Sequence, residues 1–197
     1  MSFLKNIFGV QKKRNASLLD AAKKGVVAAV KQSLQDGAEI NARDEGKSTP
    51  LHWAMDRCSS DATITLLEAG AEVDALNVSQ YSPLHWAAHY GHIATVEILL
   101  AAGADLTLKN VNGKTPITIA RDEKHIELAN YLQSIVDDPT KRPTPEKVGL
   151  DINKRNTALE ALGKPITKPV VGKYTAKAVA GMEAQRQAAL NDPSEGI

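Results

Sequence analysis

The sequence repeats one short motif at a fixed interval. It reads STPLHWAM at residues 48–55, YSPLHWAA at residues 81–88 and KTPITIAR at residues 114–121. The second residue of each copy is threonine or serine, and successive copies are 33 residues apart. A constant period of this length indicates an array of stacked structural repeats.

Other residues keep the same period. A glycine–alanine pair begins at Gly37, Gly70 and Gly103. One period upstream of Thr49, the segment ASLLDAAKKGVVAAVKQSLQDGA fits the frame from residue 16 onward, without the Thr-Pro pair. No Gly-Ala pair follows residue 136 to begin another copy. The sequence therefore predicts four units, in a repeat domain over residues 16–138.

The residue types in each unit predict two short helices. Threonine or serine followed by proline is typical of a helix start, because the hydroxyl caps the first turn and proline fits the first helical position. An alanine-rich first helix is followed by a second with an apolar stripe, which ends at the glycine. We expect an all-α solenoid of stacked helix–turn–helix units with short hairpin loops, plus a largely disordered C-terminal tail.

At these residues the chain resembles the ankyrin repeat family. Thr/Ser-Pro-Leu-His-Trp-Ala occurs twice, Gly-Ala before an acidic residue occurs three times, and Gly91-His92 lies in the central unit. The resemblance implies a role in protein–protein binding, through hairpin tips and the concave ends of the first helices. The matching residues here are Asp56, Arg57, Val78, Ser79, Tyr81, His89, Tyr90, Val111, Asn112, Lys114, Asp122 and Glu123.

Some turns depart from this pattern. Only the last hairpin has glycine at the expected turn position, Gly113, where the other two have Lys47 and Gln80. Cys58 and Lys124 replace the glycine found between the two helices of the other units. The sequence therefore predicts less regular loops at these four places.

The histidines admit two interpretations. His85 and His89 are four residues apart and share a helical face, as zinc ligands do. However, no cysteine or carboxylate completes a ligand set nearby, and His52 lies one period before His85. The resemblance assigns His52 and His85 to hydrogen bonds that tie adjoining turns together, and Trp53 and Trp86 to packing between units. We expect no metal site and no cofactor.

Charge and motifs narrow the class of function. Lys and Arg number 24 against 23 Asp and Glu, but residues 16–138 are acidic and both ends are basic. Neither a membrane span nor a secretory signal is evident, and a single cysteine suits a reducing compartment, so we expect a cytoplasmic protein. We find no phosphate-binding loop or nucleophile elbow, and expect a non-catalytic adaptor or scaffold rather than an enzyme. The alternative is a targeting or regulatory factor whose basic ends bind a membrane surface or nucleic acid.

The two ends stand apart from the repeats. Within residues 1–15, four apolar residues at positions 3, 4, 7 and 8 share a helical face, which either covers the first repeat or lies on a membrane. Three prolines predict an extended linker at residues 137–147, at the start of a basic tail over 139–197. Short helices are predicted near 157–162 and at 174–191. Either end could fold upon a protein partner, and we expect the chain alone to be monomeric.

Overall fold

The structure, a computed structural model, describes residues 2–163 of the 197-residue chain, with side chains from residue 9 onward. These residues contain helices and no β-strand. The four units comprise α1 (Ser2–Lys24) with α2 (Val27–Gln35), α3 (Pro50–Asp56) with α4 (Ser60–Glu68), α5 (Pro83–Tyr90) with α6 (Ile93–Ala101), and α7 (Pro116–Asp122) with α8 (Ile126–Asp137). Two single turns, η1 (Pro139–Lys141) and η2 (Glu146–Val148), and one more helix, α9 (Ile152–Ala161), follow.

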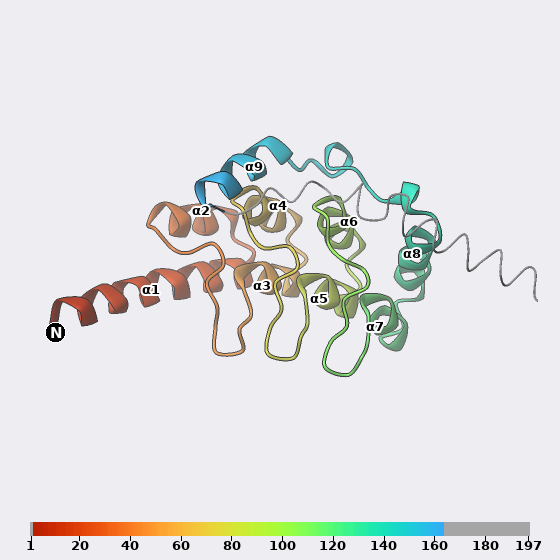
Figure 1. Cartoon of the computed structure of the whole chain (residues 1–197), viewed down its shortest axis with the longest axis horizontal. Helices are drawn as coiled ribbons and strands as arrows, with labels where there is room; N and C mark the ends of the chain where they lie inside the picture. The colour runs from red at the N-terminus through yellow and green to blue at the C-terminus, as the bar shows by residue number, and fades with distance from the viewer. Residues whose placement is uncertain (1, 164–197) are drawn as a thin grey trace, which may run out of the picture.

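The helices form two layers, which confirms the predicted solenoid (Figure 1). The first helices of the units, α1, α3, α5 and α7, lie side by side in one layer, and the second helices form the other. The loops between units extend as hairpins beyond the first-helix layer, at the lower edge of Figure 1. No helix in residues 2–163 is both long and apolar enough to cross a bilayer.

The repeated motif begins each first helix as expected. Proline occupies the first position of α3, α5 and α7, after a threonine or serine in extended conformation. Ser82 and His85 cap α5 reciprocally, and Thr49 and His52 do the same for α3. These caps satisfy backbone N–H groups that a helix start otherwise leaves without partners.

The core lies between the two layers and is built from aliphatic side chains. Leucines of both layers are fully buried at matched positions of successive units, while alanines such as Ala54 and Ala87 let the first helices approach closely. The fully buried leucines include Leu51, Leu66, Leu67, Leu84, Leu99 and Leu128. Each unit therefore completes the burial of its apolar faces against its neighbours, as expected of a solenoid.

The turns are more regular than the sequence predicted. Lys47 and Gln80 adopt left-handed φ angles of 58° and 56°, close to the 72° of Gly113. Cys58 and Lys124 likewise replace glycine with φ angles of 52° and 66°. A left-handed residue with a side chain costs about 1–2 kcal/mol. The prediction of irregular loops was wrong, because each of these four residues closes its turn with a local hydrogen bond from its N–H to the carbonyl three residues earlier.

Helix α1 crosses the boundary that the sequence placed after residue 15. It is one continuous helix from Ser2 to Lys24. Its middle is attached to the first unit: Gln11 Nε2 donates to the carbonyl of Gly37 at 3.1 Å, and Asn15 Oδ1 accepts from the backbone N–H of Glu39 at 2.9 Å. Residues 9–15 are therefore an extension of the first repeat helix rather than a separate segment.

Residues 139–162, which we call the C-terminal strap, return across the second-helix layer (Figure 1). The Arg142 guanidinium donates to the carbonyls of Leu100, at 2.8 Å, and of Ala104, at the end of α6. Leu150 and Leu159 are buried. The predicted extended linker was therefore wrong: the prolines begin or precede 3-10 turns, and the buried leucines hold the strap against the repeats.

Helix α9 corresponds to the helix predicted near residues 157–162 but begins earlier. Asp151 caps it, since its carboxylate accepts from the backbone N–H groups of Asn153 and Lys154. The helix lies over α4, where Lys154 Nζ is 3.6 Å from the Glu68 carboxylate. The helix predicted at 174–191 lies outside the described residues.

Candidate protein-binding surface

The two histidines of the repeated motif are part of the frame. His52 Nδ1 accepts from the backbone N–H of Thr49 at 3.1 Å, and Nε2 donates to the carbonyl of Tyr81 in the next unit at 2.9 Å. His85 makes the matching bonds, to the N–H of Ser82 at 3.1 Å and to the carbonyl of Lys114 at 3.1 Å. Each imidazole thus ties one helix start to the following hairpin.

Burial keeps both imidazoles neutral. Desolvation lowers the pKa of His52 from 6.5 to about 4, and it lowers the pKa of His85 as well. A neutral ring with a proton on Nε2 matches the bonds above, because carbonyl oxygens only accept. Among the described residues, no three His, Cys, Asp or Glu side chains gather as metal ligands would.

The end of α5 carries an ordered aromatic group. The Tyr90 ring lies edge-on to Trp86, with centroids 6.4 Å apart, and is stacked on His92 at 5.8 Å. Burial raises the Tyr90 pKa, and so does the nearby carboxylate of Asp56, the last residue of α3. The structure therefore brings together two of the expected contact residues, Asp56 and Tyr90, from neighbouring units.

Ion pairs connect further contact residues across the third and fourth units. His89 Nδ1 is 3.0 Å from a carboxylate oxygen of Glu123, and Lys114 Nζ is 2.8 Å from Asp122. All four side chains are about half exposed, so these pairs add little stability. They do place the two acidic residues at the end of α7 against an imidazole and an ammonium group.

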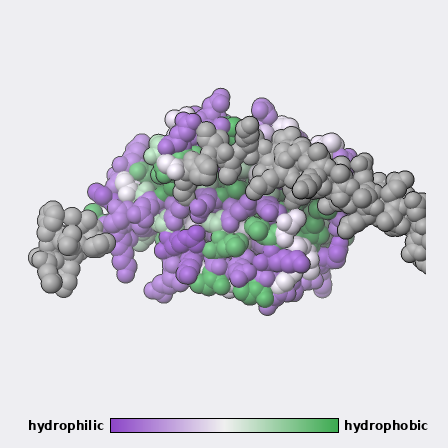
Figure 2. Space-filling view, viewed as in Figure 1, coloured by the Kyte–Doolittle hydropathy of each residue, from purple (hydrophilic) through white to green (hydrophobic). Residues whose placement is uncertain are grey.

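Adjacent hairpin tips are joined through their backbones. The N–H of Val78 donates to the Gly46 carbonyl at 2.9 Å, and the N–H of Val111 donates to the Ser79 carbonyl at 3.1 Å. The side chains of Val78 and Val111 are 57% and 58% exposed. Figure 2 shows hydrophobic surface at the lower edge of a largely hydrophilic face, where the tips lie. The tips thus form a linked, partly apolar row.

Three other expected contact residues differ from one another in their surroundings. Asn112 is exposed at the last tip, where its backbone N–H donates to Asn110 Oδ1. Arg57 is exposed at the end of α3. Tyr81, in contrast, is half-buried against the core, and its ring is tilted against His85 at 5.5 Å. Tyr81 is therefore as much a packing residue as a surface one.

A row of aromatic rings links the units, and the sequence interpretation treated its tryptophans as packing alone. Trp53 and Trp86 lie edge-to-face with centroids 5.3 Å apart, and Lys23 Nζ lies 4.4 Å from the centre of the Trp53 ring. Both tryptophans are half-buried rather than buried, so each also presents surface. Continuing through Tyr90, the aromatic row spans the second and third units, and Lys23 of the first unit lies over its first ring.

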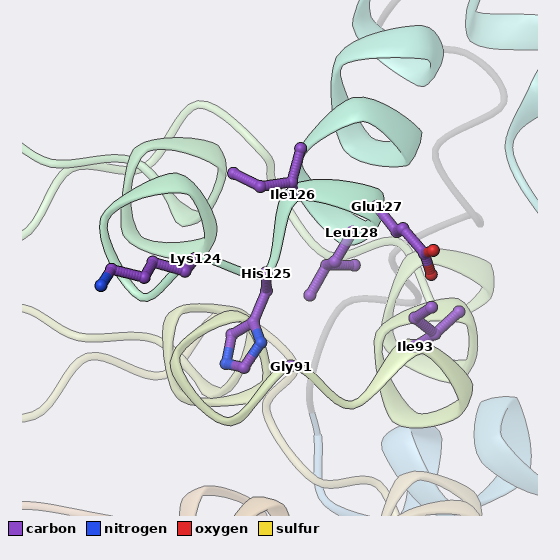
Figure 3. Close-up of a pocket in the computed structure, with 7 residues that line it drawn as sticks. All are labelled: Gly91, Ile93, Lys124, His125, Ile126, Glu127 and Leu128. Carbon is purple, nitrogen blue, oxygen red and sulfur yellow. The ribbon is translucent and has the colours of Figure 1, made fainter.

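A separate pocket lies at the turns before α6 and α8 (Figure 3). The His125 ring lies over Gly91, and its Nε2 donates to the carbonyl of His89 at 2.9 Å. A Cβ added to Gly91 would be 2.5 Å from His125 Nδ1. The ring thus needs glycine beneath it, and it ties the fourth unit to the third.

The repeat pattern is also found by comparison with protein families. A family model described as ankyrin repeats (3 copies) matches residues 18–110, which cover α2 to α6 and the last part of α1. No curated protein matches the chain. The fourth pair, α7 and α8, follows the matched region and continues the stack.

Proposed function

We propose, from the premise that residues 18–110 belong to the ankyrin-repeat family, that this chain is a non-catalytic adaptor or scaffold that binds a protein partner. Ankyrin repeats are generally protein–protein interaction modules and are typically non-catalytic. The partner would contact the hairpin tips and the ends of the first helices.

The ordered Tyr90 group is the observation that best supports this surface. Interface anchors are commonly aromatic residues that neighbouring groups hold in place, because little conformational entropy is then lost on binding. Tyr90 meets this description, since Trp86, His92 and Asp56 all contact it. His89, exposed beside it and oriented by Glu123, would add a polar contact.

The same contacts argue against a chemical role for these side chains. Burial and the nearby carboxylate of Asp56 raise the Tyr90 pKa, so the phenol stays protonated. His89 is paired with an exposed carboxylate. We propose that these groups orient a partner rather than transform a substrate.

Site-specific photo-crosslinking in the native cell tests the proposal. A photoreactive phenylalanine analogue at position 90 should capture a discrete protein. The same analogue at position 31, an exposed residue of α2 in the other layer, is the matched control and should not capture it. Equal capture at both positions, or none at position 90, would count against a surface at the ends of the first helices.

A further inference from the structure

The two tryptophans differ in one hydrogen bond. Trp53 Nε1 donates to Asp44 Oδ2 at 2.9 Å. One period later, Asn77 replaces the aspartate. Its Oδ1 accepts from the backbone N–H groups of Ser79 and Tyr81, at 3.0 Å each, but an amide NH2, which cannot accept, replaces the second carboxylate oxygen. No described residue accepts from Trp86 Nε1, and this nitrogen is accessible to solvent. The third unit thus presents an indole N–H that the second unit satisfies internally.

Neighbouring rings hold this donor in place. Trp86 lies between Trp53, at 5.3 Å, and Tyr90, at 6.4 Å, and its ring is also edge-on to His52 at 5.8 Å. A partner that covers Trp86 would remove water from the indole N–H. Leaving a covered donor unpaired costs about 1–3 kcal/mol. A partner that binds here should therefore carry an acceptor for this nitrogen.

Two cations beside the row lack an ion-pair partner among the described residues and favour an anionic acceptor. Nearby carboxylates keep their charge but already interact within the chain: Asp44 accepts from Trp53, Asp56 lies beside the Tyr90 phenol, and Glu123 pairs with His89. The cations are different. In the described part of the chain, no carboxylate lies within ion-pair distance of either Lys23 or Arg57.

Both cations lie at the ends of first helices, Lys23 on α1 and Arg57 after α3. Lys23 lies over the outer face of the aromatic row, 4.4 Å from the centre of Trp53, and is exposed. Arg57 is exposed at the end of α3, with its Cβ beside the turn that follows α1. The first half of the surface therefore carries two exposed cations that no carboxylate of the described chain contacts.

We propose that Trp86, Lys23 and Arg57 recognise the carboxylates of an acidic peptide segment, with one carboxylate accepting from Trp86 Nε1. This inference rests on the proposed protein-binding function and specifies the partner's chemistry. A carboxylate satisfies the indole donor and the unbalanced cations together, and a charge-assisted hydrogen bond is about twice as strong as a neutral one. A neutral backbone carbonyl would satisfy only the indole.

The chain has two tryptophans, so two indole N–H signals report on the site by nitrogen-15 NMR. The variants Trp53→Phe and Trp86→Phe assign them. The probe is a capped peptide of alternating glutamate and glycine, and its matched control has glutamine for glutamate. The glutamate peptide should move the Trp86 signal and leave the Trp53 signal, which is bonded to Asp44, nearly in place. The control should bind about tenfold more weakly.

Variants separate the donor from the ring. Trp86→Phe keeps an aromatic ring and removes the N–H, and Lys23→Gln removes a cation. Each should weaken binding of the glutamate peptide about three- to tenfold, whereas Lys31→Gln on α2 should not change it. Failure of the glutamate peptide to move the Trp86 signal, or equal binding of the glutamine peptide, overturns the inference.

The inference and the proposed function fail in different ways. If a captured partner binds Trp86→Phe and Lys23→Gln with full affinity but loses affinity for Tyr90→Ala, acidic recognition is wrong and protein binding at this surface stands. If the partner is indifferent to Tyr90→Ala as well, the proposed surface is wrong.

Discussion

His52 and Tyr81 join the second unit to the third: the imidazole Nε2 donates to the tyrosine carbonyl at 2.9 Å, across 29 residues of sequence. His85 repeats this bond with Lys114, again 29 residues on. Because Nδ1 of each ring accepts from its own helix start, one side chain orders both a cap and the next hairpin. Stability and surface geometry therefore depend on the same two residues.

Loss of either imidazole should lower stability without changing the fold. His52→Ala leaves the Tyr81 carbonyl and the Thr49 N–H without partners in a buried site, which costs about 1–3 kcal/mol of unfolding free energy. Urea denaturation measures the loss. His89→Ala, at an exposed position in α5, should change stability by less than about 0.5 kcal/mol. Equal effects of the two variants would contradict the framework role of His52.

Acid should weaken the fold through His52. The folded chain protonates this ring only near pH 4, whereas the unfolded chain does so near 6.5. Between these values the unfolded state binds more protons than the folded state. The contribution of His52 to the free energy of unfolding is therefore fully present above pH 6.5 and is lost as the pH falls toward 4. The ring contributes about 3 kcal/mol to this loss, at about 1.4 kcal/mol for each pKa unit. His85 acts in the same direction.

The matched measurement for this pH effect is His52→Gln, which cannot titrate. Urea midpoints at pH 7.5 and pH 4.5 should differ less in this variant than in the parent chain. An unchanged difference would mean that other groups cause the acid sensitivity.

Two glycines with the same backbone conformation should respond differently to alanine. Gly91 and Gly113 have φ angles of 75° and 72°, so alanine suffers the same left-handed penalty, about 1 kcal/mol, at both. At Gly113 the new Cβ meets open space, but at Gly91 it meets the His125 ring. Gly91→Ala should therefore destabilise by at least about 1 kcal/mol more, as overpacking does. Similar thermal shifts for the two variants would show that His125 moves aside freely.

The C-terminal strap should contribute measurably to stability. Leu159 is buried on α9, whereas Leu162, just after that helix, is 47% exposed. Leu159→Ala should cost about 2–4 kcal/mol by creating a cavity, and Leu162→Ala less than about 1 kcal/mol. Denaturant melts of both variants make the comparison. Equal small losses would indicate that the strap is detached in solution.

The solenoid could be predicted from the sequence because its determinants are local and repeated. Thr49, Ser82 and Thr115 mark helix starts, and the 33-residue period shows that these starts stack. The regular hairpin turns were missed because their signal lies three residues before Lys47 and Gln80. Asp44 and Asn77 start these turns, and their side-chain oxygens accept from backbone N–H groups of the same hairpin.

The strap was not predicted because its contacts are distant in the sequence. Its prolines favour an extended linker locally, but Arg142 bonds to the Leu100 carbonyl on α6, 42 residues earlier. For the surface, the 33-residue period identified Tyr90 and His89 as expected contact residues. It did not identify the indole N–H of Trp86, from which no described residue accepts a hydrogen bond. The exchange of Asp44 for Asn77 at matched positions was a visible signal of that difference.

The affinity of a purified partner, captured through position 90, for three forms of the chain tests the central claim most directly. The forms are the parent chain, Tyr90→Ala and Lys31→Ala, each shown to be folded by circular dichroism. The account predicts that Tyr90→Ala weakens binding by about 1–3 kcal/mol, roughly five- to 150-fold, and that Lys31→Ala leaves it unchanged. Full affinity of folded Tyr90→Ala would contradict a protein-binding surface at the ends of the first helices.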